Sequence, residues 1–350
     1  MQSSRSYLLI LLAAIHVTAT EWPVPDWKTA RSPQSSGFSG EGLERYRAWL
    51  NKSVSAKPWG TVIVRHGRVV FEDYGSGASR DSVWEIGSLR KSVYSSLIGI
   101  AIQEGKLTLD TPVHQIWPPI FDLTTQEKDK RILYRHLATA TSGWRLPSQP
   151  GEFWRYDNLA FSAGHAALAR LYNLPDDRIA PMVESRIRNV IGAKSWKVWH
   201  YEDGWEKSPG PKLAVDSNMR DLAKYGYLWL RKGRWRKRQV VPETYIAEAS
   251  RNQVVHLGRH YGYLWMTNDG RVALPSVPAD AFFHTGTGGE RRTVLLICPS
   301  LDLVAVIGHD RSAYSLTPVD INDLKGASTG VDAWIAQVMA ALNITTSQAR

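Results

Sequence analysis

The sequence predicts an α+β fold: one antiparallel sheet built from both ends of the chain, flanked by helices, with a helical lobe inserted between them. Two observations carry this prediction. Short runs rich in β-branched and other apolar residues are concentrated near the two ends, at 61–71 and 263–307. Between 160 and 230 the apolar residues instead recur at the three-to-four-residue spacing of a helix.

The elements of the first sheet segment follow in order. The apolar residues of 43–50 recur at helical spacing and predict a helix. Two strands are expected next, at 61–64 and 68–71, because His66 and Gly67 between them form a tight hairpin signal.

The elements near the other end complete the predicted sheet. Strands are expected at 263–266, 293–297 and 303–307, and the turn residues of 299–302 connect the last two. An amphipathic helix at 331–342 follows them.

The middle of the chain predicts a separate lobe. Helical periodicity covers 160–172, 178–191 and 218–230, and the links between these segments are rich in Pro, Gly and Trp. We therefore expect a split α/β lobe at 20–115 and 255–350, a mostly helical lobe at 116–254, and an active site between the two lobes.

Composition and charge limit the class of protein. With 350 residues, 43% hydrophobic and 22% charged, the chain is neither disordered nor a multi-span membrane protein. Its net charge of +10 is scattered, apart from a basic run at 231–238. This run is expected to be the solvated end of a helix with a turn at Gly233, or alternatively a patch for an anionic polymer or surface. No nucleic-acid-binding motif accompanies it, so no nucleic-acid partner is expected.

The first nineteen residues predict a secretory signal. Arg5 precedes an apolar stretch at 7–14, and Val17 and Ala19 are small residues at the expected cleavage site. The mature chain is therefore expected to be secreted or periplasmic, with cleavage after Ala19. An uncleaved anchor is the alternative, although the apolar run is shorter than the about 20 residues that cross a bilayer.

The cysteine and histidine residues predict neither a disulfide nor a metal site. Cys298 is the one cysteine, so no intramolecular disulfide forms, and its apolar surroundings predict a buried thiol. His256 and His260 have a spacing that ligates zinc from a helix, but no third ligand is evident. We expect no metal and no cofactor.

Ser88 and Lys91 form the first candidate catalytic pair. They stand three residues apart at the predicted start of a helix, within the sequence SLRK, and so share one face of that helix. Lys91 can then reach the Ser88 hydroxyl and, if burial or another cation disfavours its charge, act as its base. The backbone N–H of Ser88 at the helix start would supply half of an oxyanion hole.

Tyr156 and Asn158 form a second candidate group, in the sequence YDN ahead of a predicted helix. The Tyr156 phenol, made more acidic by Lys91, could relay the Ser88 proton to a leaving group. The Asn158 amide could orient Lys91 or hold a substrate carbonyl.

His284, Thr285, Gly286 and Thr287 form the third candidate group, a glycine-rich turn that enters the strand expected from 293. Glycines beside a strand allow a substrate backbone to lie close, and the N–H of Thr287 can complete the oxyanion hole. No Gly-Lys-Ser/Thr ending follows, so the segment is not a phosphate loop.

The order of SLRK, YDN and HTG, with the connecting phrases HLATATSGW and MRDLAKYGYLWLRKGRW, resembles the penicillin-recognising serine hydrolases. This family includes class C β-lactamases, D-Ala-D-Ala carboxypeptidases and related esterases and amidases. The resemblance covers about residues 59–310. It implies Ser88 as the acylated nucleophile, Lys91 and Tyr156 as the proton-transfer pair, and Asn158 as a positioning amide.

One departure from the family pattern bears on the substrate. The lysine of the family's K-T-G motif is His284 here, a group only fractionally charged near neutral pH. Recognition of a substrate carboxylate is thereby weakened, unless Arg291 or Arg292 takes over.

The expected function is an exported serine hydrolase that acts on a small-molecule ester, amide or β-lactam, with a small carboxylic ester favoured. The alternatives are a β-lactamase or D-Ala-D-Ala carboxypeptidase, a penicillin-binding sensor acylated without turnover, and a catalytically silent scaffold.

Overall fold

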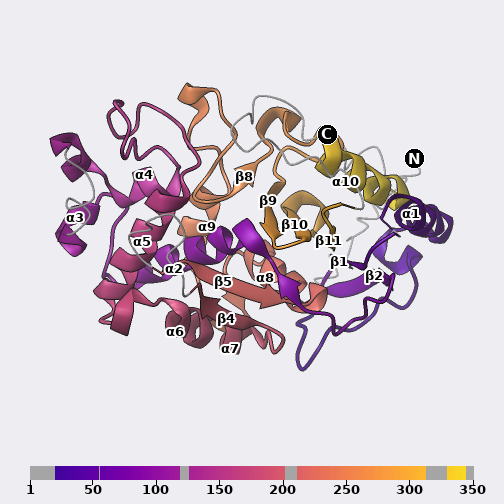
Figure 1. Cartoon of the computed structure of the whole chain (residues 1–350). Coiled ribbons are helices and arrows are strands. Elements are labelled where there is room, and N and C mark those ends of the chain that lie inside the picture. Colours follow the sequence, from indigo (N-terminus) through magenta and orange to yellow (C-terminus); the bar gives the residue numbers. More distant parts are fainter. Residues whose placement is uncertain (1–19, 55, 119–125, 202–210, 313–328, 344–350) are drawn as a thin grey trace, which may run out of the picture.

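The central element of the fold is a six-stranded antiparallel sheet with the strand order β2-β1-β11-β10-β9-β8 (Figure 1). Its strands are β1 (Trp59–Arg65), β2 (Arg68–Gly75), β8 (Met266–Thr267), β9 (Phe282–Gly288), β10 (Arg291–Cys298) and β11 (Leu303–Asp310). The computed structural model describes residues 20–343 except 55, 119–125, 202–210 and 313–328, so the expected signal segment 1–19 lies outside the described residues. The antiparallel pair β1–β11 joins the two ends of the chain, which confirms the predicted α+β class.

Two tight connections of this sheet use left-handed backbone. His66 (φ 52°) and Gly67 (φ 73°) join β1 to β2, and Asp302 (φ 50°) ends the turn between β10 and β11. His and Asp tolerate this conformation better than most residues with a Cβ. The two turns also contact each other, since His66 Nδ1 lies 3.0 Å from Asp302 Oδ2. These local signals explain why both connections are predictable from the sequence.

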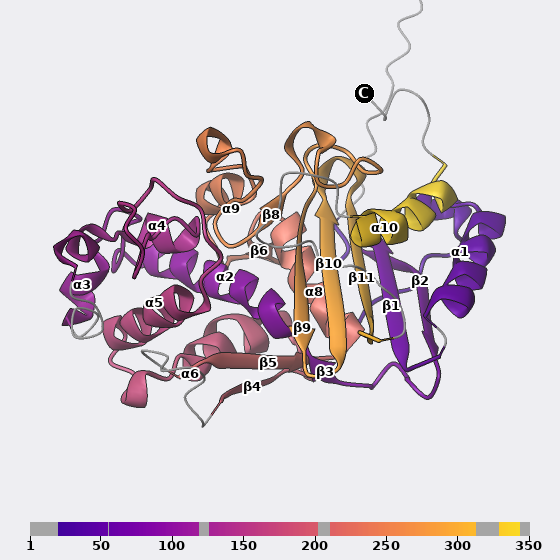
Figure 2. The same ribbon diagram turned by 45° about the horizontal axis from the view of Figure 1, so that its top comes forward.

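Helices cover both faces of the sheet (Figure 2). On one face α1 (Gly40–Ser53) packs against α10 (Thr329–Ala341), and Tyr46 of α1 bonds Thr61 of β1. On the other face lies α8 (Met219–Leu230), where Gly226 allows Leu295 and Val304 to approach the helix backbone. Strands β1 and β11 are buried along their whole length, as strands covered on both sides must be.

The second part of the molecule is mostly helical. Its main helices are α2 (Arg90–Gln103), α4 (Tyr134–Ala138), α5 (Asn158–Leu171), α6 (Ala180–Val183) and α9 (Glu243–Ala249), with short α3 (Val113–Ile116) and α7 (Asn189–Ile191). Helix α2 lies at the centre and contacts α5, α6 and α9. A small antiparallel sheet of β3 (Trp84–Glu85), β5 (Leu213–Ser217) and β4 (Lys197–His200) runs along this part. Within the described ranges, no helix is both long and apolar enough to cross a membrane.

Three segments differ from the sequence predictions. Residues 180–191 form one continuous helical stretch, α6 followed by a π-helical turn at 184–188 and α7, in place of a regular α-helix from 178; the stretch begins at Ala180 because Pro181 is tolerated only in the first turn of a helix. The expected strand at 263–266 is reduced to Met266, since Leu264 has a φ of 60° that interrupts an extended chain. Helix α8 packs on the sheet, although the sequence analysis places it in the helical lobe.

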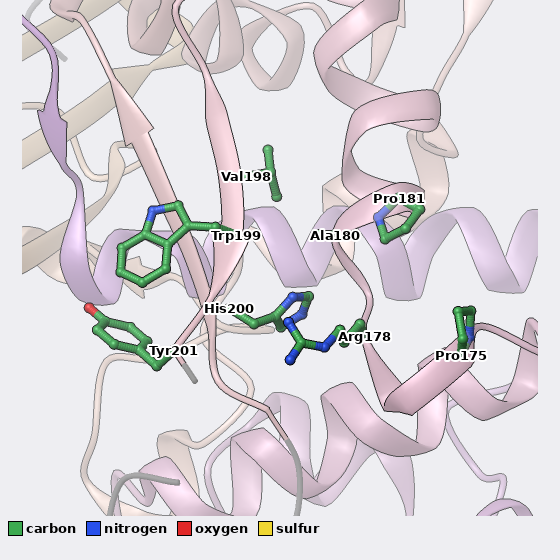
Figure 3. Close-up of a pocket in the computed structure, with 8 residues that line it drawn as sticks. All are labelled: Pro175, Arg178, Ala180, Pro181, Val198, Trp199, His200 and Tyr201. Carbon is green, nitrogen blue, oxygen red and sulfur yellow. The ribbon is translucent and has the colours of Figure 1, made fainter. Parts of the chain in front are cut away.

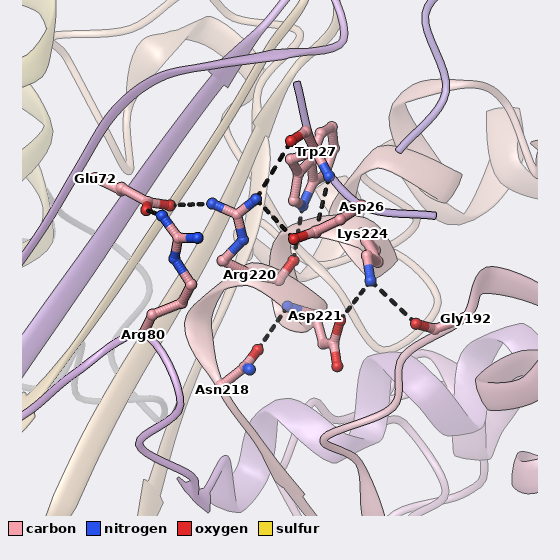
Figure 4. A network of polar contacts seen from close by, with 9 residues as sticks. All are labelled: Asp26, Trp27, Glu72, Arg80, Gly192, Asn218, Arg220, Asp221 and Lys224. Atoms are coloured by element: carbon pink, nitrogen blue, oxygen red, sulfur yellow. Dashed lines mark hydrogen bonds and ion pairs between the residues drawn. The ribbon is translucent and has the colours of Figure 1, made fainter. Parts of the chain in front are cut away.

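A polar network fixes α8 in this position (Figure 4). The almost fully buried Arg220 of α8 is ion-paired with Glu72 of β2 and with Asp26, whose Oδ2 lies 3.1 Å away. One turn further along α8, Lys224 Nζ donates to the Gly192 carbonyl at 3.0 Å. The helix is thereby tied to the N-terminal segment, the sheet and the helical part at once.

The basic run 231–238 follows α8 as expected. Gly233 (φ 77°) forms a turn, and the short strands β6 (Arg234–Trp235) and β7 (Arg238–Gln239) make a hairpin. Arg236 and Lys237 at its tip are exposed to solvent. The run is therefore a solvated hairpin at the end of a helix.

The buried Tyr46 hydroxyl generates a stability prediction. It lies 3.0 Å from Thr61 Oγ1 and accepts the Trp334 Nε1–H at 2.8 Å, so Tyr46→Phe leaves a buried donor without a partner. We expect the free energy of unfolding in urea to fall by about 1–3 kcal/mol. Tyr74→Phe is the matched control, because the Tyr74 hydroxyl is buried without a hydrogen bond to any described residue. That change should cost less than about 0.5 kcal/mol, and equal losses in both variants would contradict the assignment.

Candidate active site

Ser88 lies in a single turn of 3-10 helix, η2 (Gly87–Leu89), directly before α2. The preceding Gly87 has a φ of 55°, and a Cβ at that position would lie 2.2 Å from the Thr287 carbonyl oxygen of β9. Only glycine satisfies both conditions. The turn that carries Ser88 is therefore held directly against strand β9.

Lys91 contacts Ser88 as the spacing predicts. Its Nζ lies 3.2 Å from Ser88 Oγ, and the side chain is 1% exposed. Burial lowers the pKa of Lys91 well below its ordinary value, and the positive charges of Arg90 and Lys212 lower it further. The lowered pKa favours the neutral amine, the form that can accept the Ser88 proton.

Tyr156 covers Lys91 with its ring. The Lys91 Nζ lies 4.6 Å from the centroid of the Tyr156 ring and 5.4 Å from that of Phe161. Burial raises the pKa of Tyr156 to about 12, while the Ser88 side chain and the charge of Arg90 act in the opposite direction. The expectation that Lys91 makes this phenol more acidic is therefore wrong in its net result, because burial is the larger effect. The phenol remains protonated.

Asn158 is the first residue of α5. Its neighbour Asp157 caps the helix and accepts hydrogen bonds from the N–H groups of Leu159 and Ala160. Asn158 itself is half-buried, and its amide forms no hydrogen bond to another residue in the described part of the chain. The amide is available to a substrate.

The glycine-rich segment that follows His284 is a strand and not a turn. Residues 284–288 belong to β9, and a Cβ at Gly286 would lie 1.8 Å from the Ile86 carbonyl oxygen. A Cβ at Gly288 would similarly lie 2.7 Å from the Glu85 carbonyl oxygen. The glycines are required because β9 passes against the backbone of residues 85–87.

This packing also brings the Thr287 backbone against Gly87, the residue before Ser88. The Thr287 nitrogen lies 2.6 Å from the position that a Cβ of Gly87 would take, and the Thr287 side chain is exposed. Thr285 is half-buried on the same side of β9. Two neighbouring amides at a nucleophile are the arrangement that an oxyanion hole requires.

His284 is neutral in this structure. Its side chain is fully buried, and its Nδ1–H donates to the Thr285 carbonyl oxygen at 2.7 Å. Burial lowers the pKa of His284 to about 3, with a further contribution from Lys91. Its Nε2 is buried without a hydrogen-bond partner among the described residues. The position that carries lysine in the K-T-G motif therefore carries no charge here.

Sequence reasoning missed Arg90, which lies between the catalytic candidates on the same turn of α2. The side chain is 4% exposed, and its charge lowers the pKa of Lys91 and of His284. The only sequence signal is a cation next to Lys91, and its burial depends on the tertiary packing.

The remaining candidates lie elsewhere. The Arg291 guanidinium stacks over the Trp84 ring at 5.2 Å, and Arg292 lies opposite Thr287 in the β9–β10 register. Cys298 is buried, as predicted, and burial raises the pKa of its thiol to about 12. Within the described ranges, no group of three or more His, Cys, Asp or Glu residues is placed to hold a metal ion.

A separate pocket lies on the helical side (Figure 3), with a volume of about 580 Å³. Trp199 and Tyr201 line it on one side and Arg178 with Pro181 on the other. None of the candidate catalytic residues lines this pocket, so the nucleophile and the pocket are distinct features.

Comparison with known proteins identifies the family. The sequence profile of the Beta-lactamase family matches residues 59–314, a stretch that contains Ser88, Lys91, Tyr156 and His284. The chain belongs to the beta-lactamase family. Members of this family are in general serine hydrolases that act on small molecules, which agrees with the geometry around Ser88.

Individual relatives are distant from this beta-lactamase-family protein. An uncharacterised protein of Alkalihalophilus pseudofirmus is 24% identical over 291 residues, which cover 70% of this chain and 81% of the relative. A candidate beta-lactamase from Bacteroides dorei has a TM-score of 0.66 at 17% identity, covering 88% of this chain and 100% of its own. An octameric penicillin-binding protein homologue from Pyrococcus abyssi has a TM-score of 0.59 at 16% identity, covering 78% and 74%. At these identities the solved structures establish the shared fold.

The contact of β9 with the Ser88 turn generates a prediction. Gly286→Ala places a Cβ against the Ile86 carbonyl, so β9 must shift and carry the Thr287 amide away from Ser88. We expect the rate of Ser88 acylation by a p-nitrophenyl ester to fall by about 100-fold or more.

Gly289→Ala provides the control for that experiment. Gly289 follows β9 with a φ of 52°, and nothing lies within 4 Å of its Cβ position. The alanine variant should lose about 1 kcal/mol of stability through backbone strain and keep its acylation rate within a few-fold. Full activity in Gly286→Ala would show that the close packing of β9 is not needed for the reaction.

Proposed function

We propose that the chain is an exported serine hydrolase that cleaves an ester or amide through an acyl-enzyme on Ser88, with small carboxylic esters favoured. The observation that carries this proposal is the 3.2 Å contact between Lys91 Nζ and Ser88 Oγ. Burial and the charge of Arg90 lower the pKa of this amine and so favour its neutral form. A serine whose hydroxyl lies beside a buried, neutral amine has a base next to it and is thereby activated as a nucleophile.

Acylation follows from these positions. Ser88 Oγ attacks the substrate carbonyl carbon while Lys91 takes the hydroxyl proton, and the carbonyl oxygen becomes negatively charged. We assign the stabilisation of that oxygen to the backbone amides of Ser88 and Thr287, because Thr287 packs against Gly87, the residue before Ser88. Collapse of the tetrahedral intermediate breaks the bond to the leaving group, which departs with the proton from Lys91.

Tyr156 supports this proton transfer in its neutral form. With a pKa of about 12 the phenol stays protonated, and its ring covers the Lys91 amine. Its O–H can therefore give its proton to the leaving group while it receives the proton held by Lys91, so one proton passes in all, and its ring excludes water from Lys91. The Asn158 amide binds the substrate next to its carbonyl group, and the backbone of Thr285 and Gly286 borders the same part of the site.

Deacylation uses the same groups in reverse. A water molecule gives a proton to Lys91 and attacks the acyl carbon, the bond to Ser88 Oγ breaks, and Ser88 recovers its proton from Lys91. The products are a carboxylic acid and the free enzyme. None of these steps requires a metal or a cofactor.

The preference for esters rests on His284. Because this side chain is neutral, β9 offers no cation to the carboxylate of a penicillin or a D-Ala-D-Ala peptide. Hydrolysis of β-lactams is the second candidate, since structural neighbours include a penicillin-binding protein homologue and a candidate beta-lactamase.

Export is the part of the proposal that rests on the sequence alone. It depends on the apolar stretch at 7–14 and on Ala19 as the cleavage site. N-terminal sequencing of protein recovered from outside the cytoplasm should begin at Thr20, and a retained Met1 would remove this part of the proposal.

The first prediction for this function concerns the nucleophile. Wild-type protein should gain the mass of one acyl or phosphonyl group after exposure to a p-nitrophenyl ester or a serine-directed fluorophosphonate. Ser88→Ala should show no such gain by intact-mass spectrometry, because among the described residues no other serine hydroxyl accepts a hydrogen bond from a lysine amine. Ser92→Ala, four residues along on α2, is the control and should label normally. Undiminished labelling of Ser88→Ala would refute the assignment.

The second prediction concerns substrate choice and pH. The wild type should hydrolyse p-nitrophenyl butyrate with a higher kcat/KM than benzylpenicillin at pH 7. Because the lowered pKa of His284 is about 3, its neutral form persists above about pH 4, and the ratio of the two values should not change between pH 8 and pH 5. A gain for penicillin near pH 6 would instead indicate an imidazole of ordinary pKa. Stable acylation by penicillin without turnover would favour a sensor protein.

A further inference from the structure

Arg90 is a buried cation that the proposed reaction does not use as a proton carrier. It opens helix α2, whose residues from Arg90 to Ala101 are all buried. The guanidinium side chain is 4% exposed, and its Nε is buried without a hydrogen-bond partner among the described residues. A guanidinium does not lose its charge in a protein, so burying it without a counter-ion is unfavourable.

The nearby carboxylate does not neutralise Arg90. Glu85 is close enough to favour the charged form of Arg90, as are Tyr156 and Tyr201, but no carboxylate in the described ranges forms an ion pair with the guanidinium. Glu85 instead accepts a hydrogen bond from the Tyr201 hydroxyl. Among the described residues, the Arg90 Nε–H therefore has no acceptor.

Arg90 also lies within electrostatic range of the reacting groups. It is two residues from Ser88, and its charge acts on Lys91, His284 and Tyr156. Arg90 is a permanent cation, and it directly follows the turn that carries the nucleophile. Lys212, the other cation that acts on Lys91, stacks on the ring of Tyr201 with its Nζ 4.4 Å from the centroid.

Other arginines near the strand are committed elsewhere. Arg291 stacks on Trp84, and its Nη1 lies 3.7 Å from Asp310. Arg292 lies across from Thr287 and His309 in the sheet register and already has an interaction of its own. The sequence-based expectation that one of them receives a substrate carboxylate is therefore not supported by their positions.

We propose that Arg90 is the recognition site for a carboxylate carried by the substrate, so that the preferred substrates are short esters or amides with a carboxylate a few bonds from the scissile carbonyl. Half-esters of short dicarboxylic acids have this chemistry. The planar fork of arginine can bind both carboxylate oxygens at once. This inference rests on the proposed acyl-enzyme reaction at Ser88. The cation that binds the carboxylate then lies on α2 and not on β9, so the carboxylate approaches from a different side than a lysine at position 284 would require.

Matched pairs of substrates test the proposal. For a carboxylate on the acyl group, the pair is p-nitrophenyl hydrogen glutarate and its neutral methyl ester. For a carboxylate on the leaving group, the pair is the butyrate ester of 3-hydroxybenzoic acid and that of 3-hydroxybenzamide. The measured quantity is the ratio of kcat/KM for the acid to that for its neutral partner.

We expect this ratio to be at least 10 for the wild type in one of the two pairs, and that pair identifies which side of the substrate carries the carboxylate. Arg90→Gln should reduce the ratio to within two-fold of 1. Arg90→Lys should keep an intermediate ratio, because it retains the charge but not the fork. Each ratio is measured at the pH optimum of its own variant, since Arg90 also influences the pKa of Lys91.

A wild-type ratio near 1 in both pairs would overturn the proposal, and this result does not depend on whether any variant folds. A ratio that survives in Arg90→Gln would also overturn it, because the carboxylate would then be bound elsewhere. Failure of the acyl-enzyme proposal gives a different result: neither member of either pair is hydrolysed and Ser88 is not labelled.

Discussion

The burial of Lys91 beside Ser88 is the constraint on which the rest of the site depends. An ammonium taken out of water is strongly disfavoured, so burial lowers the pKa of Lys91 and favours the neutral amine that can act as a base. The rings of Tyr156 and Phe161 lie against the amine. Strand β9 packs on the turn that carries Ser88, and it can lie this close only because Gly286 has no Cβ. The same packing holds Thr287 against Gly87, the residue before Ser88, so the proposed oxyanion hole depends on this contact between a strand and a helix start.

Much of the fold could be predicted because its signals are local. The hairpin of β1 and β2 and the β10–β11 connection combine apolar runs with turn residues at fixed places, and pairing of the two chain ends follows from their similar patterns. Strands β4 and β5 were not predicted, because each is five residues or fewer and is held by its neighbours in the sheet. The segment at 284–288 was expected to be a turn, since glycine disfavours strands. Its glycines are explained only by the backbone of residues 85–87, which is distant in sequence.

The candidate site shows the same division between spacing and environment. The three-residue spacing of Ser88 and Lys91 fixes their contact through helix geometry alone, so that pair was predictable. The pKa values of the site were harder to predict, because they depend on burial. The pKa of Tyr156 is raised and not lowered, and the pKa of His284 lies far below its ordinary value. Arg90 could not be recognised from its residue type. Only its burial at the start of helix α2 shows that a cation with no ion-pair partner among the described residues lies near the nucleophile.

The measurement that tests the central claim most directly is the titration of Lys91 itself. Protein labelled with [ε-13C]lysine can be followed by NMR across pH, with Lys91→Gln to assign the resonance. We expect the ε-carbon of Lys91 to titrate well below the ordinary range of lysine, and Arg90→Gln to move this titration to higher pH because a neighbouring positive charge is removed. Titration of Lys91 in the ordinary lysine range would show that the amine is charged at neutral pH, and it would contradict its role as the base of Ser88.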